Sequence, residues 1–305
     1  MPKRSQPDRE RLAQLLRENS YYHITCYNDE FYCGDHPDGK CRRGFFSLFI
    51  QALYGMSFAK SYGLPYKVDF SNVSYPYSEP KDDALTNFWE DLMVSEVIPP
   101  GLNPIYNLKY ETYPLRIWHR GFLRSLHKTC RSEIRFQKNL ASKLVTIKKA
   151  LEPFRVLGVH ARRTDHHLEV PAADEETLLR SIRKKMQGFD RLFVATDDAY
   201  FLESLKRLYP GRVIAHDFCR SETSQAVHDF RGKKNGKLLG EQALLDCLSL
   251  SFCQELILSP SNLSYAALIF QPELPYSLVE SSTAAWSRHK TLLAYLLNRW
   301  GIRKW

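Results

Sequence analysis

Four ionisable residues lie close together between His160 and Asp165, where a histidine and an aspartate enclose Arg162 and Arg163. They follow a short apolar run, 155–159, whose β-branched residues are typical of a buried strand. In open α/β sheets, ligands bind beyond the carboxyl ends of the strands, and a planar, permanently charged guanidinium suits a phosphate there. The stretch therefore predicts an anion site. Its alternative is a solvated loop in which these charges pair with one another.

Two later strand-like stretches also end in polar side chains. Residues 191–196 are followed by Asp197 and Asp198, and residues 255–258 are followed by Ser259, Pro260, Ser261 and Asn262. Three polar strand ends at one edge of a sheet predict a nucleotide site. Asp198 precedes an expected helix, so it is equally a candidate N-cap. The aspartate pair lacks the separated oxygen ligands that a magnesium or manganese site gathers, so no metal site is predicted.

Asp246 is the most unusual carboxylate of the chain. Its expected helix, 241–253, is apolar nearly all round. A carboxylate buried there must find a partner or lose its charge. It is therefore a candidate ligand-binding residue, and the alternative is a structural pair with a buried arginine or a cap on a loop.

The amino-terminal half carries another basic loop ahead of a helix. The expected elements are a strand at 21–27, a turn-rich loop at 33–44, a helix at 45–61 and a strand at 66–70. This order gives the βαβ unit of a doubly wound sheet. Arg43 and Gly44 then lie at the amino end of the helix, where free N–H groups favour an anion. The alternative is an exposed basic turn.

The carboxyl-terminal half alternates strands with helices. We expect strands at 155–160, 191–196, 212–215 and 255–258, and helices at 174–186, 199–209 and 241–253. A helix at 132–151 would connect the halves, and a mixed-charge helix would occupy residues 1–20. The pattern predicts an α/β protein with two Rossmann-like domains facing a cleft, residues 1–150 and 151–305. It contains no G-x-G-x-x-G motif, which disfavours a nicotinamide-dependent enzyme.

The composition is that of an ordinary globular protein: 305 residues, 44% hydrophobic and 25% charged. No long apolar run and no secretory signal occur, so we expect a cytoplasmic protein. The net charge of +9 suits nucleic acid, a membrane surface or an anionic substrate alike. Seven unpaired-looking cysteines are typical of reduced thiols. His23, Cys26, Cys33, His36 and Cys41 are close in sequence, but their spacing matches no zinc signature.

Three motifs together resemble those of the GDP-fucose-dependent fucosyltransferases. They are Gly158-Val-His-Ala-Arg-Arg-Thr-Asp165, Ala195-Thr-Asp-Asp198, and Leu244-Leu-Asp246 with Ser259-Pro-Ser-Asn262. The pattern is most similar to that of the α1,6-fucosyltransferases, both the animal core-type and the bacterial nodulation-factor enzymes. The α1,2- and protein O-fucosyltransferases share parts of it. The resemblance covers the second half well and the first half loosely, through the loop that ends at Gly44.

The resemblance implies a two-domain glycosyltransferase fold of the B type. It also implies inverting, metal-independent transfer of L-fucose from GDP-β-L-fucose to a hydroxyl of an oligosaccharide or glycolipid acceptor, in α1,6 or α1,2 linkage. Arg162 would bind the β-phosphate, and His160 and Asp246 would contact guanine. The full set of expected donor-binding residues is Arg43, Gly44, His160, Arg162, Arg163, Asp197, Asp198, Asp246, Ser261 and Asn262. Catalytic roles are expected for Arg162, Asp165 and Glu169.

The chemistry of the reaction agrees with these residue types. Breaking the bond between C1 of fucose and the β-phosphate leaves negative charge on the phosphate, so fixed donors there stabilise the transition state. An arginine can thus replace the divalent metal that other transferases use, and no cofactor is expected. Asp165 and Glu169 are candidate bases for the acceptor hydroxyl. The competing classes are an inactive GDP-sugar-binding protein and, less favoured, a nucleic-acid binder, because the basic residues are mostly dispersed.

The last residues of the sequence form a basic, aromatic segment. After Glu280 there is no acidic residue, whereas five are basic: Arg288, Lys290, Arg299, Arg303 and Lys304. Trp286, Leu293, Leu297 and Trp300 recur at helical spacing. This pattern is typical of an interfacial helix and predicts peripheral membrane contact. The alternative is a helix that packs back across the two domains.

Overall fold

The computed structural model describes residues 19–26, 39–78, 85–106, 116–163, 175–222 and 235–302. The helix predicted within residues 1–20 lies almost wholly outside these ranges. The candidate bases Asp165 and Glu169, and the cysteine and histidine at 33 and 36, also lie outside them. No helix in the described ranges combines the length and the hydropathy needed to span a bilayer.

The larger of two parallel sheets belongs to the carboxyl-terminal half. Its strand order is β6 (Val213–Ile214), β5 (Arg191–Thr196), β4 (Val156–Ala161), β7 (Glu255–Leu258) and β8 (Tyr276–Leu278). Every residue of β4 is buried, as expected for a central parallel strand with helices on both faces. Gly158 is required there, because a Cβ would lie 2.5 Å from the Leu256 side chain and 2.9 Å from Sγ of Cys253.

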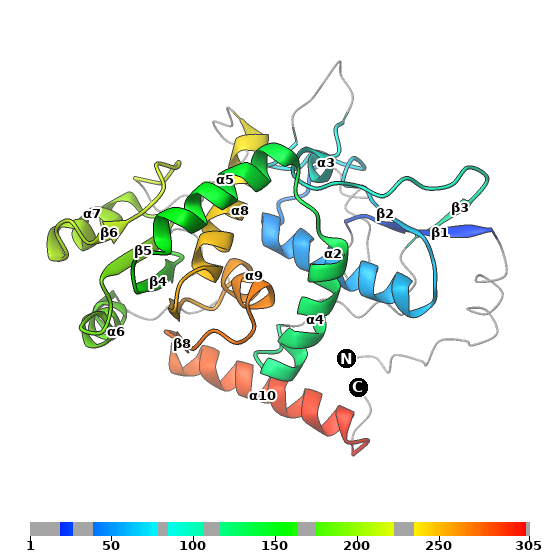
Figure 1. Ribbon diagram of the computed structural model, residues 1–305. Coiled ribbons are helices and arrows are strands. Elements are labelled where there is room, and N and C mark those ends of the chain that lie inside the picture. The colour runs from blue at the N-terminus through cyan, green and yellow to red at the C-terminus, as the bar shows by residue number, and fades with distance from the viewer. Residues whose placement is uncertain are drawn as a thin grey trace.

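Helices cover both faces of this sheet (Figure 1). One face packs against α6 (Glu175–Met186) and α7 (Ala199–Leu208) through Ile182, Met186, Phe201 and Leu205. The other packs against α8 (Gly236–Ser251) and α9 (Asn262–Phe270). Their apolar side chains meet the opposite residues of the strands, since successive residues of a strand point to opposite faces. The strand–helix alternation predicted for this half is therefore confirmed.

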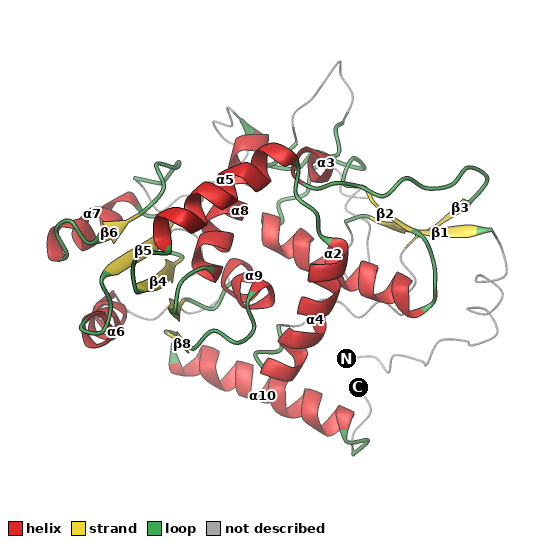
Figure 2. Ribbon diagram, in the orientation of Figure 1, coloured by secondary structure: helices red, strands yellow, loops and turns green. Residues whose placement is uncertain are grey.

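A smaller sheet belongs to the amino-terminal half. It has three parallel strands in the order β2 (Tyr66–Val68), β1 (Ser20–Ile24) and β3 (Asn103–Tyr106) (Figure 2). Helix α2 (Phe45–Ser61) has the predicted bounds, and its buried residues share one core with Tyr22 and Ile24 of β1. The βαβ order of β1, α2 and β2 is thus confirmed. The α/β class and the parallel sheets follow from these two sheets.

The two halves share a continuous apolar core. Helix α9 packs against both α2 and α4 (Arg120–Glu133), and the Tyr265 hydroxyl of α9 donates to the carbonyl of Ile117 at 3.1 Å. Helix α10 (Ser282–Arg299) also returns to the amino-terminal half, where Tyr295 meets Phe122 edge to face at 5.3 Å. The division at residue 150 into two Rossmann-like domains stays a prediction.

The single helix predicted at 132–151 is wrong. The chain instead forms α4, ending at Glu133, and α5 (Lys138–Leu151), with an extended link between them. The link is held by main-chain hydrogen bonds next to α3 (Phe88–Leu92): Val94 N–H to the Arg135 carbonyl at 2.8 Å, and Gln137 N–H to the Leu92 carbonyl at 3.0 Å. These contacts join segments more than forty residues apart, so helical periodicity could not reveal them.

Candidate functional site

A cavity of about 700 Å³ lies where the ends of three carboxyl-terminal elements meet the loop before α2. Its lining includes Gly44, Phe45 and Tyr77 from the amino-terminal half, and His160, Arg162, Thr196, Asp197, Phe218, Gln242, Asp246 and Asn262 from the carboxyl-terminal half. The ends of β4 and β5 and the start of α9 thus converge as the sequence predicted. A cavity of this size falls in the range of small-ligand sites, about 300–1,000 Å³.

Asp246 enters the cavity wall from α8. Its Oδ1 is closed off from solvent and accepts no hydrogen bond from the described part of the chain. Burial raises the pKa of Asp246 to about 7, and the positive charge of Arg220 offsets part of that rise. An unpartnered buried carboxylate is costly, so a ligand that donates hydrogen bonds to it would be bound strongly. The structural alternative, an ion pair with a buried arginine, is not formed among the described side chains.

Arg220 instead organises the loop beside Asp246. Its Nη2 donates to the His216 carbonyl at 2.7 Å, and its Nη1 donates to the Phe218 carbonyl at 3.0 Å. The His216 ring stacks on Phe218 at 4.7 Å and bonds Oγ of Ser249 at 2.8 Å. Burial, with a smaller effect of Arg220, lowers the pKa of His216 to about 4, so this ring is neutral. The result is a rigid aromatic wall at the Asp246 end of the cavity.

Sequence reasoning missed this wall because it treated 216–240 as a polar loop. Helix α8 begins at Gly236, five residues earlier than predicted, because Oδ1 of Asn235 accepts the N–H of Leu238 at 2.8 Å and caps it. The asparagine and the glycine that follows it were the available signal.

His160 reaches the cavity from the end of β4. Its Nδ1 lies 2.7 Å from Oγ of Ser264, and that hydroxyl is also 2.6 Å from the Ser259 carbonyl. The single hydroxyl proton goes to the carbonyl, so Oγ accepts from Nδ1–H of His160. In the neutral ring, Nε2 is then an acceptor. Ser264 was not predicted as a site residue, and it sets the tautomer of His160, which was predicted.

The two adjacent arginines have different positions. Arg162 lines the cavity. Arg163 does not: its Nε contacts Oδ2 of Asp198 at 3.0 Å, a terminal nitrogen pairs with Glu175, and its guanidinium lies 4.9 Å from the Phe201 ring. Arg163 therefore stabilises the surrounding structure, and Arg162 is the arginine of this pair that can contact a ligand in the cavity.

The two aspartates after β5 differ in the same way. Asp197 lines the cavity and accepts the N–H of Arg163 at 2.8 Å, which fixes the chain after β4. Asp198 caps α7, because its Oδ1 accepts the N–H of Phe201 at 3.0 Å. The N-cap alternative for Asp198 is thus confirmed. Neither Asp198 nor Arg163 is part of the cavity lining.

The same distinction holds at the start of α9. Ser261 is buried, and its hydroxyl accepts the N–H of Ser264 at 3.1 Å as the N-cap of that helix. It does not line the cavity, whereas Asn262 does. The donor contact expected at this strand end therefore rests on Asn262 and on the helix terminus, with Ser261 holding that terminus in place.

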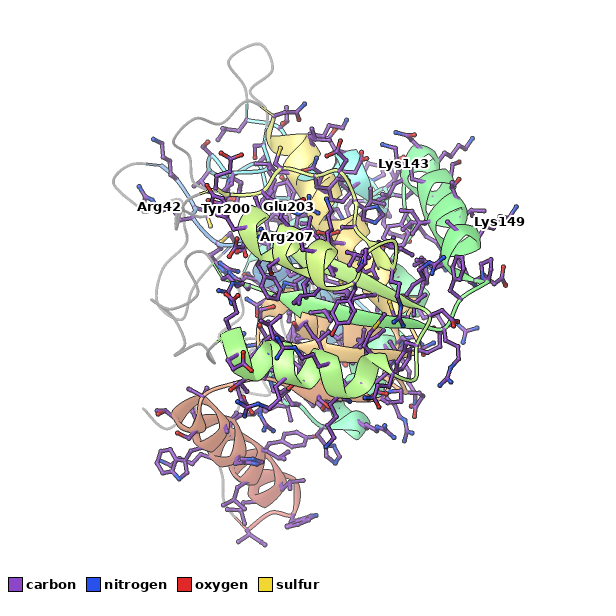
Figure 3. The ribbon with its side chains drawn as sticks, turned by 90° about the vertical axis from the view of Figure 1, so that its left-hand side faces the viewer. Arg42, Lys143, Lys149, Tyr200, Glu203 and Arg207 are labelled. Carbon is purple, nitrogen blue, oxygen red and sulfur yellow. The ribbon has the colours of Figure 1, made fainter. Side chains whose placement is uncertain are left out.

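The basic loop before α2 forms the opposite wall. Lys40, Arg42 and Arg43 all line the cavity, and Arg42 is exposed at the edge of the molecule (Figure 3). The guanidinium of Arg43 folds back on α2, where Nη2 donates to Oγ of Ser47 at 2.9 Å and Nη1 donates to Oε1 of Gln51. Gly44 ends the loop, and α2 begins at the cavity, so its positive helix end favours an anion there.

No group of three metal-binding side chains occurs among the residues that the structure describes. The buried thiols of Cys26 and Cys41 lie 3.4 Å apart, and Nε2 of His23 lies 4.0 Å from Oδ2 of Asp69. The expected independence from metal stays a prediction, and Asp165 and Glu169 lie outside the described residues.

Comparison with known proteins gives matches in structure only. No protein-family model matches the sequence, and no curated protein does. A crystal structure of NodZ α1,6-fucosyltransferase soaked with GDP-fucose matches with a TM-score of 0.51 and 16% identity over 83% of this chain and 93% of that one. NodZ co-crystallised with GDP matches with a TM-score of 0.51 and 16% identity over 87% and 96%.

POFUT1 in complex with GDP matches with a TM-score of 0.48 and 11% identity, over 86% of this chain and 98% of that one. At these identities a match is evidence of fold. The resemblance seen in the motifs is therefore confirmed at that level: this chain has the fold of the GDP-fucose-dependent fucosyltransferase NodZ along most of its length.

Proposed function

We propose that the protein is an inverting fucosyltransferase that moves L-fucose from GDP-β-L-fucose to a hydroxyl of a glycan. The observation that carries the proposal is the cavity with Asp246 in its wall, whose Oδ1 accepts no hydrogen bond from the described residues, together with Arg162, Asn262 and the basic loop before α2. The carboxylate suits a guanine base, which donates hydrogen bonds, and the basic residues suit a negatively charged diphosphate. The fold shared with NodZ supports the same reaction class.

The Asp246 end suits guanine. A carboxylate accepts two parallel hydrogen bonds, from N1–H and from the exocyclic amine, whereas uracil and adenine do not offer this pair of donors. Phe218 supplies an aromatic wall next to it, and His160 lines the same cavity. Because Oδ1 of Asp246 is closed off from solvent, the carboxylate would turn toward the cavity on binding to accept both hydrogen bonds.

The other end suits the diphosphate and its leaving-group charge. Arg162, Lys40 and Arg42 place positive charge at the cavity, and α2 and α9 both begin at its wall. As the bond between C1 and the β-phosphate oxygen breaks, negative charge grows on that oxygen, and the acceptor oxygen attacks C1 from the opposite side. Arg162 would hold the β-phosphate and stabilise this charge, so no metal or other cofactor is needed.

The acceptor is proposed to be an oligosaccharide or a glycolipid, joined through an α1,6 or α1,2 linkage. Asp165 or Glu169 would accept the proton of its hydroxyl. Since the fucosyl ring carries positive charge in the transition state, a weak base suffices. The two carboxylates follow Arg162 closely in sequence, which is the observation that supports the assignment.

The first test is nucleotide selectivity. At one hundred times their Kd, GDP and GDP-fucose should add about 2.7 kcal/mol to the free energy of unfolding by mass action and so raise the melting temperature. UDP should not raise it. Equal stabilisation by GDP and UDP would contradict the guanine assignment. An acceptor array with GDP-fucose then separates an enzyme from an inactive GDP-sugar-binding protein, because the latter would bind GDP and release no fucose to any acceptor or to water.

A further inference from the structure

Helix α10 presents an unusual stripe of exposed apolar side chains. Trp286, Leu293 and Trp300 are 62%, 55% and 65% exposed, and Ile302 just beyond them is 69% exposed. Steps of seven residues place side chains on one face of a helix, so the first three form a single line about 21 Å long. Single exposed hydrophobic residues are common, but a contiguous line of them marks an interaction site.

The opposite side of α10 is anchored to the body. Tyr295 packs edge to face on Phe122 of α4 at 5.3 Å, and Arg288 forms a two-pronged contact with Oε1 of Glu280 at 2.9 and 2.6 Å. Figure 1 shows α10 along one edge of the molecule, and Figure 3 shows its outer side standing clear of the larger sheet. The helix therefore contacts the body through one face, while its aromatic face is exposed.

The charge of this segment narrows the choice of partner. Glu280 is the last acidic residue of the sequence, and five basic residues follow it. Lys290 lies in the exposed line, with its Nζ 3.9 Å from the centre of the Trp286 ring. Two copies of this face would bring like charges together, so self-association is disfavoured. An anionic partner is required, and exposed indoles next to lysine suit the headgroup level of a bilayer.

We propose that α10 docks the protein on anionic lipid surfaces, with the line from Trp286 to Trp300 inserted at the headgroup level and Lys290 against acidic lipids. A straight line of side chains along one face of a helix matches a flat surface. This inference is independent of the proposed transfer reaction. If both are correct, the protein would act on acceptors at a membrane surface, which favours the glycolipid over the soluble oligosaccharide.

The test is flotation of the full chain with vesicles. Vesicles of phosphatidylcholine with phosphatidylserine should carry the protein at low salt, and pure phosphatidylcholine vesicles should carry little. The variant Trp286→Ser/Leu293→Ser/Trp300→Ser should stay in the soluble fraction. Its matched control, Val97→Ser/Val145→Ser/Tyr200→Ser, removes three similarly exposed apolar side chains elsewhere and should float like the wild type.

A charge variant separates lipid charge from apolar contact. Lys290→Glu should weaken partitioning about 25-fold, since each positive charge near an acidic surface contributes a factor of about five. The control Lys149→Glu, on the exposed side of α5, should change it little. Far-UV circular dichroism and the melting temperature establish that all variants are folded.

Three outcomes would overturn the proposal. They are a wild-type protein that remains soluble with acidic vesicles at low salt, equal binding to neutral vesicles, and equal loss of binding in the α10 variant and its matched control. Sedimentation without lipid measures the oligomeric state. If the wild type is a dimer and the α10 variant is a monomer, this face binds a second copy of the chain and the lipid assignment is wrong.

Discussion

Replacing Asp246 with asparagine is the sharpest test of the guanine assignment. The substitution keeps size and shape, and it removes the charge that accepts two donors from the base. Loss of charge-assisted hydrogen bonding should weaken GDP binding by about 1.5–3 kcal/mol, roughly 10- to 150-fold in Kd. Binding of UDP, which does not use this pair of bonds, should change little.

The same substitution should stabilise the protein without ligand. Burial raises the pKa of Asp246 from 3.8 to about 7. A carboxyl group whose pKa is raised on folding destabilises the folded state. This cost grows as the pH rises from the unfolded-state pKa to the folded-state pKa, and it is constant at higher pH. Since a tenfold change in proton affinity is about 1.4 kcal/mol, the cost at about pH 8 is at most on the order of 4 kcal/mol. The Asp246→Asn variant should therefore unfold later than wild type at neutral pH, and no later at about pH 4.

The raised pKa also predicts the pH dependence of GDP affinity. Guanine binds the charged carboxylate, so the wild-type Kd should rise about thirtyfold from about pH 8 to about pH 5.5 as Asp246 takes up a proton. The terminal phosphate of GDP titrates near pH 6 as well, so the decisive quantity is the difference between wild type and Asp246→Asn, measured by calorimetry. Identical pH profiles for the two proteins, or an early-unfolding variant with normal GDP affinity, would show that Asp246 is structural.

Three further predictions concern the two adjacent arginines, the core of the larger sheet and the independence from metal. Arg162→Ala should abolish turnover and leave the preference for GDP over UDP intact, because Arg162 lines the cavity. Arg163→Ala should keep nucleotide binding and lower the melting temperature, because Arg163 pairs with Asp198 outside the cavity. Equal effects of the two substitutions in a coupled GDP-release assay would refute this division. Gly158→Ala should destabilise the protein by about 1–3 kcal/mol in urea unfolding, because the added Cβ overlaps Leu256; unchanged stability would mean that the core can shift there. Transfer activity should survive EDTA, since the proposed site stabilises the leaving phosphate with arginine; loss of activity that manganese restores would reverse the claim.

Several strands and helices of both halves could be predicted from residue order. Strands 191–196 and 255–258 and helix α2 have the predicted bounds, because short β-branched runs and a broad apolar helical face are strong local signals. The convergence of the strand ends on one cavity was also predictable, because parallel strands point their carboxyl ends in one direction.

Roles of neighbouring polar residues could not be predicted in the same way. Arg162 and Arg163 are identical in type and adjacent, yet one lines the cavity and the other pairs with Asp198. Ser261 and Asn262 divide in the same manner between helix cap and cavity wall. Which of two neighbours faces a ligand depends on strand alternation and on partners that lie far away in sequence.

The sequence by itself determined the chemistry available to this protein: which side chains follow the strands, and the basic, aromatic character of its last helix. Only the tertiary structure decided how that chemistry is arranged. It broke the predicted helix at 134–137 against the end of α3, placed Arg220 and Phe218 beside Asp246, and left the Oδ1 of that aspartate without a partner among the described residues. The physical reason is that periodicity and capping act over a few residues, whereas burial, and the hydrogen bonds that burial demands, are settled by segments that meet only when the chain is folded.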